Sequence, residues 1–267
     1  MLRVGVFGAG GRMGGAVCAA VRADPELELV AAVDPAYAGT PIPAAGLVAA
    51  PGPDALAEAG AEVAVDFTVA AAAAGNAAWC ATHGVHAVIG TTGWAAPVLA
   101  ELAQSFGPGP ANCVFAPNFA IGAVLMMRFA ELAAPWFETV EVVELHHDAK
   151  LDSPSGTALL TAQRIAAARG DRPAAGPAAG PVAGLGPGPG EGPARGLEGA
   201  PGVRVHSVRL RGLVAHQEVL FGTTGQVLTL RHDSMDRSSF MPGVLIAIKA
   251  VPHRRGFTVG LDALLGL

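Results

Sequence analysis

Short apolar runs alternate with longer helical patterns through the first half of the chain. The runs predict strands at 2–7, 27–33, 63–67, 86–89 and 114–115, and the longer patterns predict helices at 15–23, 70–83 and 96–106. The segment 35–53 is rich in turn residues and is expected to be a loop. Strands that alternate with helices indicate a parallel sheet with helices on both faces.

The alternation changes after residue 117. The second half is predicted to contain helices at 121–134, 158–169 and 238–251, and strands at 140–145, 203–210, 213–221, 226–231 and 257–259. Glycine-containing turns separate the three consecutive strands, which favours an antiparallel meander. The segment 170–202 is almost wholly Gly, Pro and Ala, so it is expected to be a flexible surface loop.

Composition narrows the possible classes of protein. The 267 residues suffice for two modest domains or one large one. Although 51% of them are hydrophobic, no apolar run approaches the roughly 18 residues of a membrane span. The chain enters a strand directly, without the basic and apolar segments of a secretory signal. A soluble cytoplasmic protein with no membrane partner is therefore expected.

The net charge and the spacing of potential metal ligands argue against a nucleic-acid-binding protein and against a metal site. The formal net charge is −5 and no basic run is present, which argues against a nucleic-acid partner. Cys18, Cys80 and Cys113 form no C-x-x-C pair and are expected to be small buried residues in a reducing compartment. The eight histidines show no ligand spacing such as H-E-x-x-H, so no catalytic metal is expected.

A glycine-rich turn follows the first predicted strand and precedes the first predicted helix, as in a dinucleotide-binding fingerprint. The residues expected to contact the cofactor here are Gly8, Ala9, Gly10, Gly11, Arg12 and Met13. Met13 stands where the third glycine of G-x-G-x-x-G is expected. Asp34 ends the next strand, about 20 residues on, where a carboxylate accepts hydrogen bonds from the adenosine ribose. The alternative is an ordinary glycine-rich turn with a surface aspartate.

The residues of this turn also bear on which nicotinamide cofactor is used. Asp34 would repel a 2′-phosphate, which favours NADH. Arg12 lies in the turn and would offset that repulsion for NADPH. We therefore expect NADH to be used well and NADPH to be tolerated.

Three further loops follow predicted strand ends, where ligands bind in open parallel sheets. The residues in them that are expected to line the cofactor are Phe67, Gly90, Thr91, Thr92, Ala116, Pro117, Asn118 and Phe119. Each loop taken singly is also compatible with a plain turn. Their common position at strand ends is what supports a binding role.

The stretch from Glu144 to Thr157 carries the most concentrated chemistry in the chain. It begins at a strand end and leads into a helix, and between them lie two imidazoles, one ammonium group and a Pro-Ser-Gly-Thr turn. Such groups are suited to binding carboxylates and transferring a proton. The alternative is a strand end followed by an ordinary helix cap.

The chain resembles the dihydrodipicolinate reductases (4-hydroxy-tetrahydrodipicolinate reductases) of lysine and diaminopimelate biosynthesis. The resemblance rests on Val6–Gly14, Asp66–Thr68, Gly90–Gly93, Ala116–Phe119 and Glu144–Thr157, and later on His206–Arg209, Gly212, His216 and Asp236–Arg237. It implies an α/β protein with a Rossmann-like parallel-sheet domain and an α+β domain with a mixed or antiparallel sheet. Residues 1–118 and 238–267 would bind the dinucleotide, and 119–237 would bind substrate and form a homotetramer.

The resemblance also implies a substrate and roles for individual residues. The substrate is a cyclic imine with two carboxylates, which receives a hydride at ring C4 and a proton on the neighbouring carbon. His146 or Lys150 would give the proton, and Lys150 is favoured because its ammonium is charged at neutral pH. His147 and Lys150 are the candidate cationic partners of the carboxylates.

The turn after Lys150 is expected to bind one substrate carboxylate. The backbone amides of Ser155, Gly156 and Thr157 would point at it, and Pro154 is suited to the first helical position. Further along the chain, His216 and Arg237 are equally compatible with reaching the cleft and with a structural role, and Arg237 is counted among the residues expected to bind the cofactor.

Two other functions are compatible with part of the sequence. Another Rossmann-type amino-acid or sugar dehydrogenase would share the first half but not the His-His-x-x-Lys-x-Asp-x-Pro-Ser-Gly-Thr string. An NAD-binding redox sensor would need a recognition module such as a basic helix-turn-helix, and none is evident.

Overall fold

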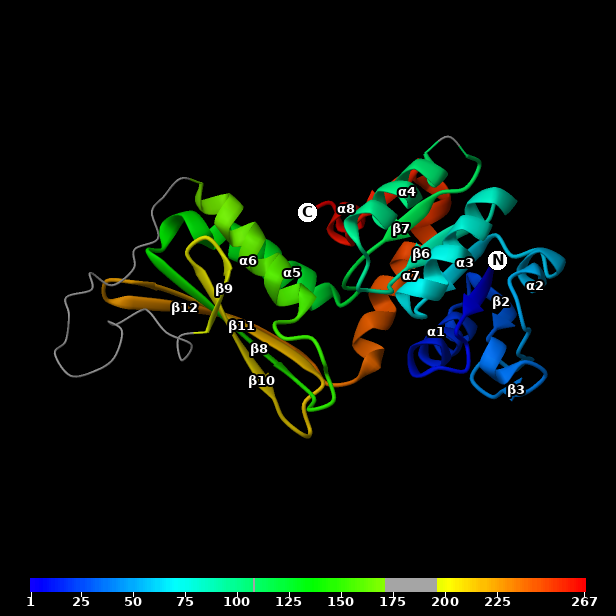
Figure 1. Ribbon diagram of the computed structural model, residues 1–267, viewed down its shortest axis with the longest axis horizontal. Helices are drawn as coiled ribbons and strands as arrows, with labels where there is room; N and C mark the ends of the chain where they lie inside the picture. The colour runs from blue at the N-terminus through cyan, green and yellow to red at the C-terminus, as the bar shows by residue number, and fades with distance from the viewer. Residues whose placement is uncertain (108, 171–195) are drawn as a thin grey trace. The chain divides into compact units, whose positions relative to one another are not determined.

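A computed structural model of the chain describes residues 1–107, 109–170 and 196–267. These residues form two compact units (Figure 1). The first unit comprises Met1–Ile121 and Arg237–Leu267, and the second comprises Gly122–Asp236. Each unit has a sheet and a hydrophobic core of its own.

A six-stranded parallel sheet organises the first unit, in the order β13-β7-β6-β5-β1-β2. Its strands are β1 (Leu2–Phe7), β2 (Leu27–Val33), β5 (Val63–Asp66), β6 (His86–Ile89), β7 (Cys113–Phe115) and β13 (Phe257–Val259). All four residues of β5 are buried, as expected for a parallel strand with helices on both faces. The parallel α/β architecture predicted from the sequence is confirmed.

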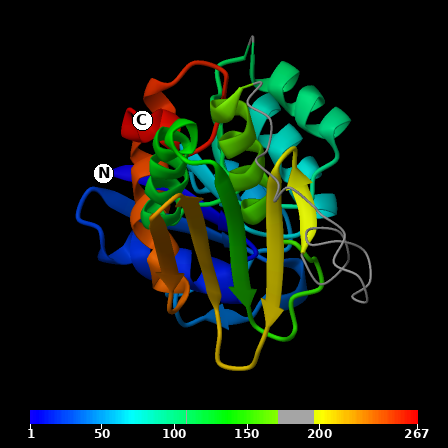
Figure 2. The ribbon, with the colours of Figure 1, turned by 90° about the vertical axis from the view of Figure 1, so that its left-hand side faces the viewer.

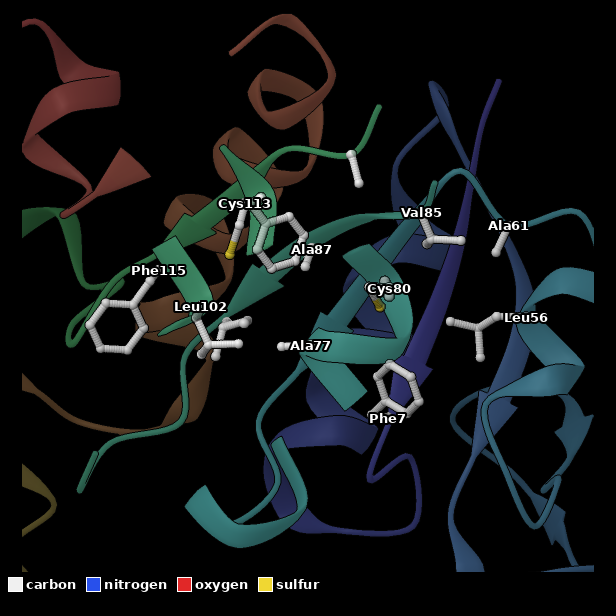
Figure 3. Packing of buried hydrophobic residues seen from close by; sticks show 14 of the residues in the cluster. Phe7, Leu56, Ala61, Ala77, Cys80, Val85, Ala87, Leu102, Cys113 and Phe115 are labelled. Carbon is white, nitrogen blue, oxygen red and sulfur yellow. The ribbon is translucent and has the colours of Figure 1, made fainter. Parts of the chain in front are cut away.

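The helices of the first unit are α1 (Arg12–Ala23), α2 (Asp54–Glu58), α3 (Ala70–His83), α4 (Ala96–Phe106), α7 (Met241–Ala250) and α8 (Asp262–Leu265). Helix α1 packs with α7, and α3 packs with α4. Figure 3 shows part of the core, in which Phe7, Leu56, Cys80, Leu102 and Phe115 are buried together. Leu56 anchors the short helix α2 to this core.

The predicted elements of the first unit are mostly confirmed. The bounds of α3, β6, α4 and β13 match the prediction, whereas α1 begins three residues earlier than predicted. The segment 35–53 was expected to be a loop but contains a 3₁₀ turn (Pro35–Tyr37) and a two-stranded hairpin, β3 (Pro41–Ile42) and β4 (Leu47–Val48). The predicted helix 238–251 is divided into 3₁₀ turns at Arg237–Phe240 and Val251–His253, with α7 between them.

A five-stranded mixed sheet organises the second unit, in the order β12-β11-β8-β10-β9 (Figure 2). Its strands are β8 (Thr139–His146), β9 (Leu197–Ala200), β10 (Val203–Arg209), β11 (Ala215–Thr223) and β12 (Gln226–Ser234). The predicted meander is wrong, because β8 lies between β10 and β11. The connection from β8 contains helix α6, so β10 runs parallel to β8, and of the three strands predicted to form the meander only β11 and β12 pair with each other.

Helices α5 (Ile121–Ala133) and α6 (Gly156–Arg169) contribute to the core of the second unit. Met126 and Ala130 of α5 are buried with Val142 of β8 and Val219 of β11, so one face of the sheet is covered. Alternate residues of β8 therefore point to this covered face, among them Glu144. Figure 2 shows the strands of the sheet from the opposite face.

One local prediction in the second unit is wrong, and another is wrong at its C-terminal end. Pro154 is not the first residue of α6, because Ser155 caps the helix and Gly156 begins it, after a cis Ser153–Pro154 bond. Residues 170–202 were predicted to form a flexible loop. Residues 171–195 of this segment lie outside the described part of the chain, and strand β9 occupies part of the remainder. Leu197–Ala200 pairs antiparallel with β10, and Ala200 contributes to the buried core.

Every helix within the described residues is too short or too polar to pass through a lipid bilayer.

Candidate active site

The glycine-rich turn at the carboxyl end of β1 opens directly onto helix α1. Gly8 has a φ of +67° and its N–H donates to Val33 O at 2.8 Å, which ties the turn to β2. Gly11 caps α1 without a side-chain hydrogen bond, so the first amides of the helix are left for a ligand. This geometry is suited to a pyrophosphate at the positive end of the helix.

Asp34 lies at the end of β2 and is 8% exposed. Its Oδ2 accepts the Gly10 N–H at 3.0 Å, and its Oδ1 accepts the Ala36 N–H at 3.1 Å. The carboxylate therefore holds the glycine turn and keeps lone pairs that can accept a ribose hydroxyl. Tyr37 packs against Gly10, where any Cβ would lie 2.3 Å from the ring.

Asp66 ties together two of the loops at neighbouring strand ends. Its Oδ1 accepts the N–H of Thr68 at 2.8 Å and the hydroxyl of Thr91 at 3.3 Å, and its Oδ2 accepts the Asn76 amide at 2.7 Å. Asp66 is 3% exposed, so these hydrogen bonds compensate a buried carboxylate. The two loops are thus held in one arrangement beyond the carboxyl ends of β5 and β6.

Aromatic side chains complete this edge of the parallel sheet. The rings of Phe67 and Phe119 lie 5.5 Å apart, centroid to centroid. A Cβ at Gly90 would lie 2.0 Å from the Phe67 ring, so only glycine allows this packing. Ala116 donates its N–H to Ile89 O at 3.0 Å, which brings the third loop to the same edge.

The remaining predicted cofactor residues lie in the same unit. Thr92 is exposed, Pro117 is half-buried, and Asn118 Oδ1 accepts the Ala120 N–H at 2.8 Å. Arg237 begins the 3₁₀ turn at Arg237–Phe240 and is half-buried. Arg12 is exposed at the start of α1 and Met13 follows it.

A second cluster lies at the carboxyl end of β8, in the second unit. Glu144 Oε2 is hydrogen-bonded to His146 Nδ1, two residues further along the same face. Arg209 donates to both oxygens of Glu144, from Nη1 at 2.9 Å and Nη2 at 2.8 Å. The Glu144 side chain is fully buried, while that of His146 is 14% exposed. The structure thus places the predicted His146 against a carboxylate–guanidinium pair.

Lys150 lies in the loop between β8 and α6 and its side chain is 22% exposed. Its Nζ donates to the two oxygens of Asp152, at 2.7 and 2.9 Å. Burial is the largest influence on the pKa of the Asp152 carboxyl and acts to raise it, but the hydrogen bond and charge of Lys150, a backbone hydrogen bond and the charge of Arg209 together outweigh burial and lower that pKa. The ammonium group of Lys150 is therefore held in the loop that contains the other predicted substrate residues.

The turn that begins α6 is built as a cap. The Ser155 hydroxyl accepts the Ala158 N–H at 3.2 Å, and the Ser155 N–H donates to Glu144 Oε1 at 3.2 Å. The Ser155 amide was expected to point at a substrate carboxylate, but it donates within the protein in this structure. Gly156 is the first residue of the helix, and a Cβ there would meet nothing within 4 Å.

The other candidate histidines have different surroundings. His147 follows the end of β8, and its carbonyl accepts the Lys150 N–H at 3.2 Å. His216 is 8% exposed and both ring nitrogens are engaged, Nδ1 with Asp233 at 2.7 Å and Nε2 with the Val214 N–H at 3.2 Å. These hydrogen bonds give His216 a structural role in β11.

The cysteines and the potential metal ligands give no further site. Burial raises the pKa of Cys18 and of Cys80 to about 12, and raises that of Cys113 as well. Within the described residues, no three His, Cys, Asp or Glu side chains are grouped as metal ligands.

Several residues with structural roles here had no predicted role, among them Glu144, Arg209 and Tyr37. Glu144 had a detectable signal, since it follows Val140 and Val142 at the same spacing on the face of the strand that is otherwise apolar. A charged residue at such a position requires a buried partner. Arg209 and Tyr37 had no comparable signal, because their partners lie far from them in the sequence.

Comparisons with protein families match nearly the whole chain. The model described as "Dihydrodipicolinate reductase, N-terminus" matches residues 2–119. The model described as "Dihydrodipicolinate reductase, C-terminus" matches residues 122–265.

Individual proteins of the same description are similar over their full length. The 4-hydroxy-tetrahydrodipicolinate reductase of Nocardia farcinica is 52% identical over 269 residues, which cover 100% of this chain and 99% of that protein. The protein of the same name from Cutibacterium acnes is 49% identical over 275 residues, which cover 100% of both chains.

Solved structures show the same relationship. A dipicolinate-bound dihydrodipicolinate reductase from Paenisporosarcina sp. TG-14 has a TM-score of 0.81 and 38% identity, covering 98% of this chain and 99% of its own. An amine dehydrogenase from Mycobacterium smegmatis has a TM-score of 0.62 at 15% identity, which indicates a shared fold alone. The similarity to the first structure extends through both units of the chain.

Proposed function

Because this chain belongs to the dihydrodipicolinate reductase family, we propose that it reduces dihydrodipicolinate to tetrahydrodipicolinate, or reduces the hydroxylated precursor to the same product with loss of water. The reaction belongs to diaminopimelate and lysine biosynthesis, and we place it in the cytoplasm. The observation that carries the proposal is the loop after β8, which combines His146, Lys150 and the Ser155 cap of α6. These groups can bind a ring that bears two carboxylates and can supply the proton that the ring accepts.

The two structural units have separate roles in this proposal. The unit with the parallel sheet binds the dinucleotide, whose reduced nicotinamide supplies the hydride for ring C4. The unit with the mixed sheet binds the ring. His147 and Lys150 neutralise the carboxylates, and Gly156 and Thr157 offer backbone hydrogen bonds at the positive end of α6, whose capping residue Ser155 donates its own amide to Glu144.

A proton must reach the ring carbon next to C4 when the hydride arrives, so that one carbon–carbon double bond becomes a single bond. Lys150 is the proposed donor, because its ammonium carries a proton at neutral pH. Asp152 holds Lys150 before substrate binds. A substrate carboxylate near Lys150 replaces part of this ion pair and turns the ammonium toward the ring.

NADH is the preferred cofactor in this proposal, and NADPH is tolerated. Asp34 is engaged with the glycine turn and keeps lone pairs for a ribose hydroxyl. A 2′-phosphate at the same position would be repelled by the carboxylate, and Arg12 would reduce that repulsion.

The Asp34→Ala variant should lower kcat/KM for NADH about 10–100-fold, since hydrogen bonds to a charged group contribute roughly 1.5–3 kcal/mol. The value for NADPH should fall less, because a repulsive charge is removed. Steady-state kinetics with both cofactors provide the test. Asp54→Ala, at the start of α2, is the matched control and should change neither value. Unchanged or improved efficiency with NADH would contradict the role of Asp34.

We further propose that the chain forms a homotetramer through the open face of the mixed sheet. This face has a cavity of about 630 Å³ whose lining includes Val143, Leu220 and the 70% exposed Val227. Apolar residues on an exposed sheet favour association with another copy. Sedimentation equilibrium should give the mass of four chains, and the mass of one chain would contradict the proposal.

The decisive experiment for the function is oxidation of NADH by the purified chain in the presence of freshly made dihydrodipicolinate precursor. Rapid oxidation that depends on the precursor is expected. Another Rossmann-type amino-acid or sugar dehydrogenase would oxidise no NADH in this mixture, and an NAD-binding sensor would bind the cofactor without turnover.

A further inference from the structure

Glu144 is a carboxylate at a position where the strand otherwise places apolar side chains. It follows Val140 and Val142 on the covered face of β8, and its side chain is fully buried, at 0% exposure. An unpaired charge in such a place would cost several kcal/mol. Its surroundings must therefore compensate it, and they show what it does.

Glu144 is held by groups from three parts of the chain. His146 contacts it from the same strand, Arg209 donates two hydrogen bonds from β10, and Ser155 donates its N–H at 3.2 Å from the turn before α6. Burial is the largest influence on its pKa and acts to raise it. Hydrogen bonds from His146, Arg209 and Ser207 together outweigh burial and lower the pKa of Glu144 to about 2. The carboxylate is thus ionised at any pH near neutrality.

The hydrogen bond to Glu144 determines which ring nitrogen of His146 carries a hydrogen and how the imidazole ring is oriented. A carboxylate can only accept from Nδ1, so Nδ1 carries a hydrogen and Nε2 is the nitrogen that changes its proton. The His146 side chain is 14% exposed, so part of the ring remains accessible beyond the buried carboxylate. A partner of this kind fixes both the tautomer and the orientation of an imidazole.

The same carboxylate also fixes the turn expected to bind an anion. Glu144 Oε1 accepts the Ser155 N–H, and Arg209 Nη2 donates to the Asp152 carbonyl at 2.6 Å. The segment Asp152–Ser155 is thereby held to the end of the sheet at both of its ends. Lys150 is joined to this segment through Asp152.

We propose that Glu144 and Arg209 are positioning residues that hold His146 and the Asp152–Ser155 turn in a single arrangement for the reduction. The inference rests on the proposed function, and it adds a role for two residues that do not themselves touch the ring. Glu144 acts through His146 and through the Ser155 amide. Arg209 acts by fixing Glu144 and the Asp152 carbonyl.

The charged groups near His146 decide the expected pH dependence. Glu144 from β8 contacts the ring of His146 and is itself bound by Arg209 from β10. The neighbouring strand β11 carries His216, which is paired with Asp233 of β12, the loop after β8 carries the Lys150–Asp152 pair, and the first turn of α6 carries no acidic side chain. Arg209 remains charged at any accessible pH. Removing the negative charge of Glu144 therefore leaves the imidazolium of His146 next to a guanidinium, which disfavours the protonated ring.

The Glu144→Gln variant should lower kcat by roughly 10–100-fold, the usual effect of losing the partner that orients a functional histidine. KM for NADH should be nearly unchanged, because the cofactor residues lie in the other unit. The part of the pH profile of kcat/KM that depends on a protonated His146 should move to lower pH, whereas the part that depends on the proposed donor Lys150 should not. Glu131→Gln is the matched control, since Glu131 is also held by two arginines, Arg128 of α5 and Arg164 of α6. It should alter neither kcat nor the pH profile.

A double-mutant cycle separates positioning from a general loss of stability. In a His146→Asn background, Glu144→Gln should lower kcat by a clearly smaller factor than in the wild type, because one of the two groups through which it acts is already missing and only the Ser155 amide remains. Effects that are fully additive, or a Glu144→Gln enzyme with the wild-type kcat and pH profile, would overturn the proposal.

A measurement on the wild-type chain keeps the proposal testable if Glu144→Gln does not fold. Nitrogen NMR of the histidine-labelled protein should find a hydrogen on Nδ1 of His146 and none on Nε2 in the neutral ring. The opposite tautomer would overturn the proposal even in an active enzyme. If the wild-type chain did not oxidise NADH in the presence of the precursor, the proposed function would be contradicted instead. The tautomer of His146 would still test whether Glu144 orients the imidazole.

Discussion

Replacement of Lys150 by alanine should lower kcat by about 10²–10⁴-fold, the range typical of a lost general acid. Lys150 is one of only two lysines in the chain, and its ammonium is held by Asp152 beside the turn that begins α6. Without it, the ring receives a hydride with no positioned proton and loses one cationic partner of a carboxylate. KM for NADH should be nearly unchanged, because the glycine turn belongs to the other unit.

Two further variants test whether the loss of kcat is specific to Lys150 and whether it reflects the proton or only the positive charge. The matched control is the other lysine, Lys249 of α7, which pairs with Asp24 at 2.9 Å in the first unit. Lys249→Ala should leave kcat unchanged. Lys150→Arg retains the positive charge but a guanidinium does not give up its proton, so kcat should stay low. Recovery of most of the rate in Lys150→Arg would show that the charge alone matters and that His146 gives the proton.

Replacement of Gly14 by alanine should raise the Kd for NADH by roughly 10–100-fold. A Cβ at this position would lie 2.0 Å from Gly8 O and 2.6 Å from Gly8 C. Both atoms belong to the backbone of the glycine turn, so the turn itself must move. Forcing extra atoms into a packed site costs typically 1–3 kcal/mol, which corresponds to about one to two powers of ten in affinity.

The neighbouring residue provides the control for Gly14. A Cβ at Gly15 would lie 3.9 Å from its nearest neighbours, which is ordinary contact. Gly15→Ala should therefore bind NADH as the wild type does, and a helical alanine should slightly stabilise the fold. Fluorescence titration with NADH measures both variants. Equal affinities of the Gly14→Ala and Gly15→Ala variants would contradict the role of the turn.

The elements that were predicted closely are those with local signals. Helix α3 ends at His83 and is capped by Gly84, whose φ of +72° is left-handed, so the end of the helix could be predicted from the glycine. The alternation of apolar residues predicted β8 and both hairpin strands β11 and β12 within a few residues. Short elements such as α2 and β9 carried too few residues to show a period.

The order of the strands was not available from local patterns. The turns before and after β11 suggested neighbours in sequence, but β10 pairs with β8, which lies much earlier in the chain. The burial of Val142, Val205 and Val219 under α5 and α6 favours β8 as the central strand. That choice depends on how the helices pack, which no single stretch of sequence contains.

The residues of the candidate site could be predicted from the sequence, but the hydrogen bonds that join them could not. His146, Lys150 and Ser155 follow one another in one stretch of the sequence. The bonds from Glu144 to Arg209 and to the Ser155 amide arise only when β8, β10 and α6 meet. The expected use of the Ser155 amide for substrate overlooked this internal acceptor, since a buried carboxylate takes nearby donors first.

The central claim is that the loop after β8 holds the two carboxylates of the ring while the nicotinamide faces it. A crystal structure of the chain with NADH and the inert ring dipicolinate tests this most directly. One carboxylate should lie on the Gly156 amide at the start of α6, the other within reach of Lys150, and the nicotinamide ring should stack over the bound dicarboxylate. Dipicolinate bound elsewhere, with Lys150 and Thr157 turned to solvent in the ternary complex, would contradict it.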